Sequence, residues 1–130
     1  DIGGKAFSLT DFRGKVVFID FWASWCAPGK KELPEVSKFS RKYGNDVVFI
    51  AINVDKRRSN AEDFLLQIPG LSPGLKVLLD SDSTVVSSYN VAAMPTSFIL
   101  DKEGVVRYVH FGFRESDPES WTEEIDKLLK

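Results

Sequence analysis

The sequence predicts an α/β fold in which a mixed β-sheet is flanked by helices, and three observations lead to it. Residues 16–23 and 47–54 are almost wholly apolar runs, typical of strands buried on both faces of a sheet. The stretch 28–43 between them is amphipathic, so the two strands are separated by a helix. Thr96–Leu100 and 105–111 enclose a tetrapeptide that contains a glycine, which predicts an antiparallel hairpin.

The first half of the chain contains three predicted elements besides these strands. Phe7 and Leu9 alternate with small polar residues, which indicates a short strand. The helix over 28–43 should be kinked by Pro34 and ended by Gly44. Its buried face is marked by apolar residues spaced three or four apart, namely Leu33, Val36, Phe39 and Tyr43. Residues 59–62 match a capping box and predict a short helix that ends near 69–70.

The second half is expected to add an apolar segment, a short turn of helix and a terminal helix. Leu75–Leu79 is short and apolar, and 84–89 fits one or two helical turns despite its β-branched residues. Asp117 and Pro118 open the last helix, with proline at the first position. The buried stripe of this helix is predicted to comprise Trp121, Ile125, Leu128 and Leu129.

Composition excludes several classes of function. The chain has 130 residues, 17 basic and 19 acidic, and a net charge of −2, so it lacks the basic excess that nucleic acid selects for. One cysteine cannot form an internal disulfide, and one histidine with it cannot supply the roughly four ligands of structural zinc. A calcium loop at 80–91 fails because valine occupies its glycine and glutamate positions. We therefore expect no metal and no cofactor.

The chain is expected to form one domain over residues 1–130. It begins without methionine, at Asp1, in a pattern that fits a hairpin turn lacking its first strand. We therefore expect that its N-terminal part is truncated. Its apolar runs fall far short of the ~20 residues that span a bilayer.

Cys26 is the first candidate for chemistry. It stands between a buried strand and a helix, where free backbone N–H groups favour the thiolate. A buried, inert cysteine is the alternative interpretation. Asp20 interrupts an apolar strand, where an unpaired carboxylate is costly, so it either serves a function or reaches solvent at the end of the sheet.

Two motifs then carry a resemblance to a known family. Residues 20–28, Asp-Phe-Trp-Ala-Ser-Trp-Cys-Ala-Pro, resemble the thioredoxin active-site segment, and Met94-Pro95-Thr96 resembles the loop that holds its cis-proline. The segments 8–15, 30–34 and about 55–90 are similar to the TlpA/ResA branch, bacterial thiol-disulfide oxidoreductases that usually act outside the cytoplasm. The resemblance implies a thioredoxin fold with a TlpA-type βα insertion.

The resemblance also implies roles for single residues. Cys26 would be the nucleophile, and Asp20 a buried group that handles protons. Residues that would contact an extended peptide substrate are Trp25, Pro28, Met94, Pro95 and Gly112. Glu32 is expected on a solvated helix face, and His110 as a structural or exposed residue without a Cys–His pair.

The chain departs from the family where the second cysteine of Cys-x-x-Cys is expected, because Gly29 stands there. Cys26 can therefore form a mixed disulfide but cannot resolve it within the same chain. Gly29 either belongs to a native monothiol protein or replaces a cysteine so as to trap a complex. The expected partners are a disulfide-containing protein, a small thiol such as glutathione, and a redox partner protein.

We further expect a monomer that lies in the periplasm or elsewhere outside the cytoplasm, with a membrane anchor in the full-length protein. Two other functions remain open. A one-cysteine peroxidase would need proline and threonine where Ile19 and Ala23 stand. A peptide-binding module would use the same groove without turnover.

Overall fold

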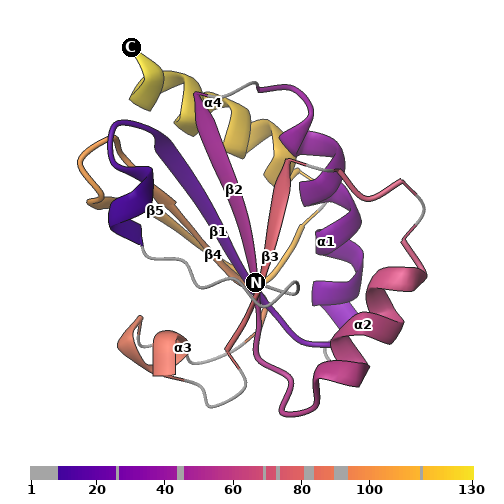
Figure 1. Ribbon diagram of the computed structural model, residues 1–130. Helices are drawn as coiled ribbons and strands as arrows, with labels where there is room; N and C mark the ends of the chain where they lie inside the picture. Colours follow the sequence, from indigo (N-terminus) through magenta and orange to yellow (C-terminus); the bar gives the residue numbers. More distant parts are fainter. Residues whose placement is uncertain are drawn as a thin grey trace.

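Five strands form one mixed sheet in the part of the chain that the structure describes. The computed structural model describes residues 9–25, 27–43, 46–68, 70–72, 74–80, 84–89, 94–114 and 116–130. The strands lie in the order β3-β2-β1-β4-β5 (Figure 1). Their bounds are Val16–Trp22 for β1, Val47–Asn53 for β2, Leu75–Leu79 for β3, Thr96–Leu100 for β4 and Val106–Phe111 for β5. The apolar segment Leu75–Leu79 is therefore a strand.

Strand β1 lies at the centre and is buried along its whole length. It pairs in parallel with β2, from Val16 opposite Val47 to Trp22 opposite Asn53. On its other side it pairs antiparallel with β4, and β4 continues into the antiparallel hairpin with β5. The two buried strands and the hairpin predicted from the sequence are thus confirmed.

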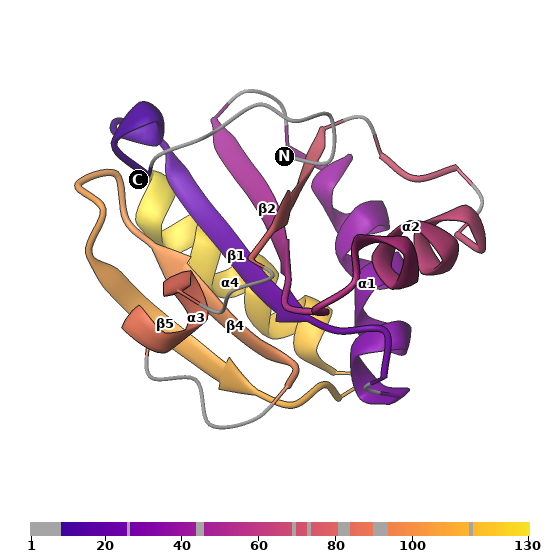
Figure 2. The same ribbon diagram turned by 60° about the horizontal axis from the view of Figure 1, so that its bottom comes forward.

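Helices cover both faces of the sheet (Figures 1 and 2). The helix α1, Ala27–Ser40, and the C-terminal helix α4, Asp117–Leu129, lie against one face. The short α3, Thr84–Ser88, lies on the opposite face, and α2, Arg58–Leu66, lies beside α1. No helix among the described residues has the length and apolar character needed to cross a membrane.

One local prediction was wrong, and another lies mostly outside the described residues. Residues 7 and 8 are not described, and Leu9–Phe12 forms a 3₁₀ helix instead of a strand, which brings Phe12 into the core on the α3 side. The capping box is absent because α2 already begins at Arg58, after an N-cap at Arg57 without a side-chain hydrogen bond. Glu62 instead binds Arg58, 2.9 Å away on the same helix. Helix α1 runs without interruption through Pro34.

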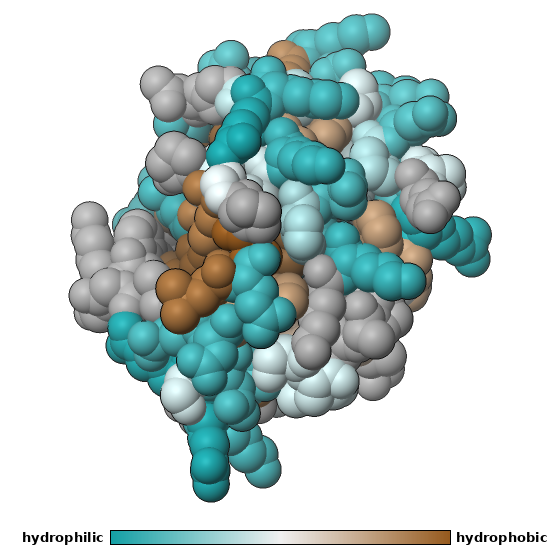
Figure 3. Space-filling model, turned by 90° about the vertical axis from the view of Figure 1, so that its right-hand side faces the viewer, coloured by the Kyte–Doolittle hydropathy of each residue, from teal (hydrophilic) through white to brown (hydrophobic). Residues whose placement is uncertain are grey.

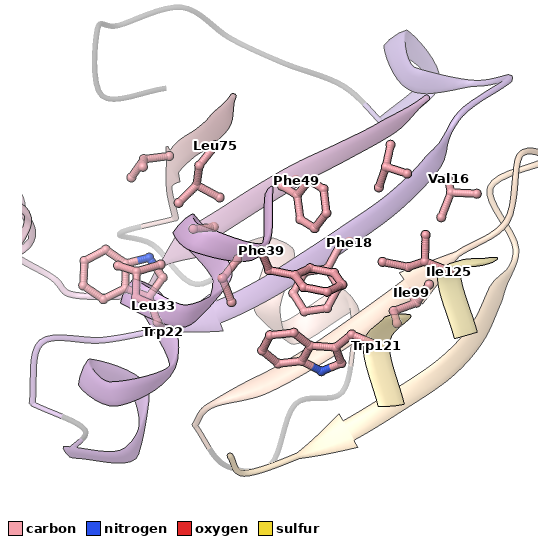
Figure 4. Packing of buried hydrophobic residues seen from close by; sticks show 14 of the residues in the cluster. Val16, Phe18, Trp22, Leu33, Phe39, Phe49, Leu75, Ile99, Trp121 and Ile125 are labelled. Atoms are coloured by element: carbon pink, nitrogen blue, oxygen red, sulfur yellow. The ribbon is translucent and has the colours of Figure 1, made fainter. Parts of the chain in front are cut away.

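The alternation of β1 side chains builds two separate cores. Phe18 and Trp22 belong to the core under α1 and α4, whereas Ile19 and Phe21 belong to the core under α3. In the first core the ring centroid of Trp121 lies 4.9 Å from that of Phe18 (Figure 4). Edge-to-face aromatic pairs of this kind add about 1 kcal/mol to the free energy gained from burial. Because both cores anchor β1, its carboxyl end has a defined position.

The side of the molecule that carries α1 and α2 is mostly hydrophilic. Figure 3 shows several apolar areas among the hydrophilic side chains of this face. Leu66, at the end of α2, is the most exposed of the large apolar residues that the structure describes, at 85%.

Candidate active site

The candidate site lies where β1 ends and α1 begins. A turn formed by Ser24 and Trp25 follows β1, and α1 starts at Ala27. Cys26 itself lies outside the described residues. The chain on both sides of it is nevertheless defined, and the first N–H groups of α1 follow it directly. Pro28 and Gly29 belong to the first turn of α1, and the structure describes only their backbone.

A carboxylate from the neighbouring strand holds the turn before Cys26. Asp55, just beyond β2, accepts hydrogen bonds from the backbone N–H and the hydroxyl of Ser24, at 2.9 and 2.8 Å. Asn53 donates a further bond to the same carboxylate, at 2.7 Å. Asp55 is buried, so its bond with Asn53 is shielded from water, whereas the two bonds with Ser24 are partly buried at the edge of the site. Sequence reasoning missed this residue because nothing local links 24 with 55.

Asp20 is fully buried within β1 and does not reach solvent. It lies between Phe18 and Trp22 in the alternation of β1, so it shares the face that α1 and α4 cover. The solvent-exposed alternative for Asp20 is thereby excluded. A carboxyl group in that position needs a polar neighbour.

Glu32 of α1 supplies that neighbour, which corrects the expectation of a solvated helix face. Its side chain is fully buried and interacts with Asp20. The pKa of Glu32 is raised to about 7, and burial is the main cause. The interaction with Asp20 opposes this increase, the negative charge of Asp117 adds to it, and the charge of His110 opposes it. Two acidic side chains therefore meet inside the protein, one from each element that flanks Cys26.

The sequence did contain a signal for Glu32. It precedes Val36 by four residues and Leu33 by one, so it belongs to the buried stripe of α1. The prediction of a solvated face rested on the charge of Glu32 and not on its position in the helix. Position on the helix decided the outcome, because α1 packs against β1 and Glu32 is fully buried.

The loop that precedes β4 lies at the same site. The peptide bond between Met94 and Pro95 is cis, as the resemblance implied. The backbone N–H of Gly112 donates to the carbonyl of Pro95 at 2.8 Å, and Gly112 has a φ of 75°, which favours glycine. Gly112 therefore binds the proline loop directly.

A groove of about 490 Å³ connects this loop with the turn before Cys26. Trp25 is 69% exposed there, as predicted, whereas Trp22 is buried in the core. The groove contains apolar and basic side chains, and its lining residues are Trp25, Val54, Asp55, Lys56, Arg57, Asn60, Val86 and Met94.

His110 lies away from this groove, on β5. Its Nε2 lies 2.6 Å from Oε1 of Glu124 on α4. In the described part of the chain, no cluster of three or more acidic, histidine or cysteine side chains could hold a metal ion.

The chain matches a family model and several known proteins. The model of the Redoxin family matches residues 1–127. Thiol-disulfide oxidoreductase ResA of Bacillus thuringiensis subsp. konkukian is 34% identical over 131 residues, covering 100% of this chain and 70% of that protein. Other ResA proteins align over as little as 60% of their own length.

Solved structures share the same architecture. A Chlorobium tepidum protein assigned as the thiol:disulfide interchange protein DsbE superposes with a TM-score of 0.86 at 36% identity, over 94% of this chain and 85% of that one. The exposed lipoprotein thioredoxin Etrx1 of Streptococcus pneumoniae has a TM-score of 0.75 at 32% identity, over 95% of this chain and 93% of that one. The arrangement of sheet and helices described above is therefore the thioredoxin-like fold.

Proposed function

The chain belongs to the Redoxin family, among relatives that are ResA-like thiol-disulfide oxidoreductases, and from this premise we propose that Cys26 forms mixed disulfides with protein disulfides. The observation that carries the proposal is the buried contact between Asp20 and Glu32. These residues come from the strand and the helix on either side of Cys26. A carboxyl group with a pKa of about 7 can hold or release a proton at neutral pH.

The exchange step is balanced without any cofactor. The thiolate of Cys26 attacks one sulfur of the substrate disulfide, a new S–S bond forms, and the second substrate sulfur leaves as a thiolate that takes a proton. Because Gly29 provides no second thiol, a separate thiol must attack the mixed disulfide. A small thiol such as glutathione or a redox partner protein would fill that role, whether Gly29 is native or replaces a cysteine.

The groove next to Cys26 is proposed to bind the substrate peptide. Trp25 and Met94 line it, and Gly112 fixes the loop that contains Pro95. Pro28 would complete the rim at the start of α1. The Redoxin match over 1–127 supports the proposal that residues 1–130 form one domain. Because a solved relative is an exposed lipoprotein, we also propose that the protein acts outside the cytoplasm.

The first test measures the thiol. Cys26 should titrate below the ~8.5 of a free thiol because the N-terminus of α1 stabilises its anion. Thiolate absorbance as a function of pH gives the pKa, and Glu35→Gln on the exposed side of α1 serves as the control. A normal or raised value would contradict the proposed reactivity.

The second test restores the missing thiol. Gly29→Cys is expected to raise the rate of insulin reduction in the presence of dithiothreitol well above that of the parent, because the second thiol resolves the mixed disulfide within the same chain. Without added reductant, the parent should accumulate a covalent adduct with insulin, visible by mass spectrometry. If no adduct forms and Gly29→Cys does not increase insulin reduction, the proposed exchange chemistry is contradicted and peptide binding without turnover remains. In that case Cys26→Ala should still bind the peptide.

A further inference from the structure

A row of polar side chains crosses the otherwise apolar face under α1 and α4. The register places Asp20 of β1 opposite Ser97 of β4, and Ser97 opposite His110 of β5. Side chains that lie directly opposite one another point to the same face, with Cβ atoms about 5 Å apart. Glu124 of α4 completes the row through its 2.6 Å hydrogen bond with His110.

The adjacent row on the same face shows the contrast. It consists of Phe18, Ile99 and Tyr108, which are likewise opposite one another in the register. Those residues pack in the aromatic core with α4, as Figure 4 shows for Phe18 and Ile99. The row through Asp20 thus places polar groups where the fold otherwise gains stability from apolar ones. Burying polar groups costs folding free energy unless they interact favourably with one another.

The row leads from the interior toward solvent. Asp20 and Ser97 are buried, whereas the side chains of His110 and Glu124 each keep 18% of their exposure. His110 can therefore exchange protons with water while it lies two strands from the buried acid. The remaining residue of the group, Glu32, approaches Asp20 from α1.

We propose that His110, held by Glu124, is the charge partner of the buried pair Asp20–Glu32, with Ser97 between them in the register. When its ring is protonated, His110 stabilises the second negative charge of the pair. When its ring is neutral, the pair keeps a proton. The inference deepens the proposed function, because the pair lies on the elements that flank Cys26, and it assigns positioning roles to His110 and Glu124.

A second charged group acts on the pair and defines the alternative. Asp117, at the start of α4, opposes ionisation of Glu32. If Asp117 governed the pair, substitutions at Asp117 would shift the pKa of Glu32 and those at His110 would not.

The test replaces the charge at position 110 in opposite ways. His110→Lys keeps a permanent positive charge, and His110→Gln removes the charge but keeps hydrogen-bonding capacity. We expect the pKa of Glu32, followed by carboxyl carbon NMR, to increase in the order His110→Lys, parent, His110→Gln. The two variants should differ by about one pH unit. A purely structural role for His110 would not give shifts of opposite sign.

Two further variants complete the design. Arg107→Gln removes an exposed positive charge near the start of the same strand, where Arg107 pairs with Asp101 at 3.3 Å, and should leave the pKa of Glu32 unchanged. Ser97→Ala should leave the order of the three Glu32 pKa values unchanged, since the buried Ser97 hydroxyl has no hydrogen-bond partner among the described residues. Equal Glu32 titration in both His110 variants, or a shift only in Asp117→Asn, would overturn the inference.

The NMR readout separates this inference from the proposed function. Glu32 titrates whether or not Cys26 is reactive, so the charge partnership stands or falls on its own. The rate of Cys26 alkylation by iodoacetamide against pH, in the same variants, then reports the link to the thiol. A Glu32 shift without any change in that profile supports the charge partnership and counts against a catalytic role of the acid pair.

Discussion

Single residues decide the chemistry of this site, and Glu32 is the clearest case. It has the same charge type as Glu35 one turn later, yet Glu35 remains partly exposed and pairs with Lys38 at 3.8 Å. Glu32 instead points into the core toward Asp20. The difference arises from the helical period, which turns position 32 toward β1.

The raised pKa of Glu32 predicts how stability depends on pH. Burial lifts this pKa from 4.5 to about 7, so the folded chain binds the proton more tightly than the unfolded chain. The contribution of Glu32 to stability is therefore greatest below pH 4.5 and decreases as pH rises toward 7, by about 3 kcal/mol. Above that range the charge of Glu32 remains a constant penalty.

Glu32→Gln should remove this penalty. The variant is expected to unfold at higher urea than the parent near about pH 8, and at nearly equal urea near about pH 5. Urea unfolding at both pH values gives the comparison, with Glu35→Gln as the matched control on the same helix. Equal midpoints for Glu32→Gln and parent near about pH 8 would show that burial does not penalise the charge.

At the scale of elements, the loop between β1 and α1 is held by a residue of another loop. Asp55 follows β2, and parallel pairing of β1 with β2 brings their carboxyl ends together. The backbone N–H of Val54 also donates to the carbonyl of Trp22 at 3.0 Å. The turn that precedes Cys26 is thus tied to β2 at two points.

Asp55→Ala should loosen this turn. The substitution leaves the buried donors of Ser24 and Asn53 without their acceptor, at a cost of about 2 kcal/mol. The alkylation rate of Cys26 should change together with the unfolding midpoint. Asp63→Ala, on the exposed side of α2, is the control and should alter neither quantity. An unchanged thiol rate in Asp55→Ala would separate the turn from the reactivity of Cys26.

At the scale of the whole molecule, β1 couples two cores that lie on opposite faces of the sheet. Trp22 and Trp121 report on the α1 and α4 side, whereas Phe98 packs with Phe21 and Tyr89 on the α3 side. Since every side chain of β1 is buried in one core or the other, neither core can unfold without exposing β1. We therefore expect one cooperative transition.

Phe98→Ala tests this coupling. It removes a buried ring from the α3 side and should destabilise the fold by about 3 to 5 kcal/mol. In a Trp25→Phe background, the fluorescence of the two buried tryptophans should show the same lowered midpoint as far-UV circular dichroism. A fluorescence midpoint that stays at the parental value would mean that the two faces unfold separately.

The sequence by itself determined the elements and the chemistry-bearing motif. Continuous apolar runs identified β1 and β2, because strands buried on both faces need no alternation. The hairpin β4-β5 followed from its glycine turn, and the segment around Cys26 carried enough of a family pattern to indicate the fold. These features are local, so they can be read from neighbouring residues.

The tertiary structure alone decided which distant residues meet. Glu32 faces Asp20 only because α1 packs against β1, and Asp55 reaches Ser24 only because two parallel strands end at the same edge. His110 joins Asp20 through a register across three strands. Contacts of this kind depend on strand order, register and helix packing, which no local pattern in the sequence specifies.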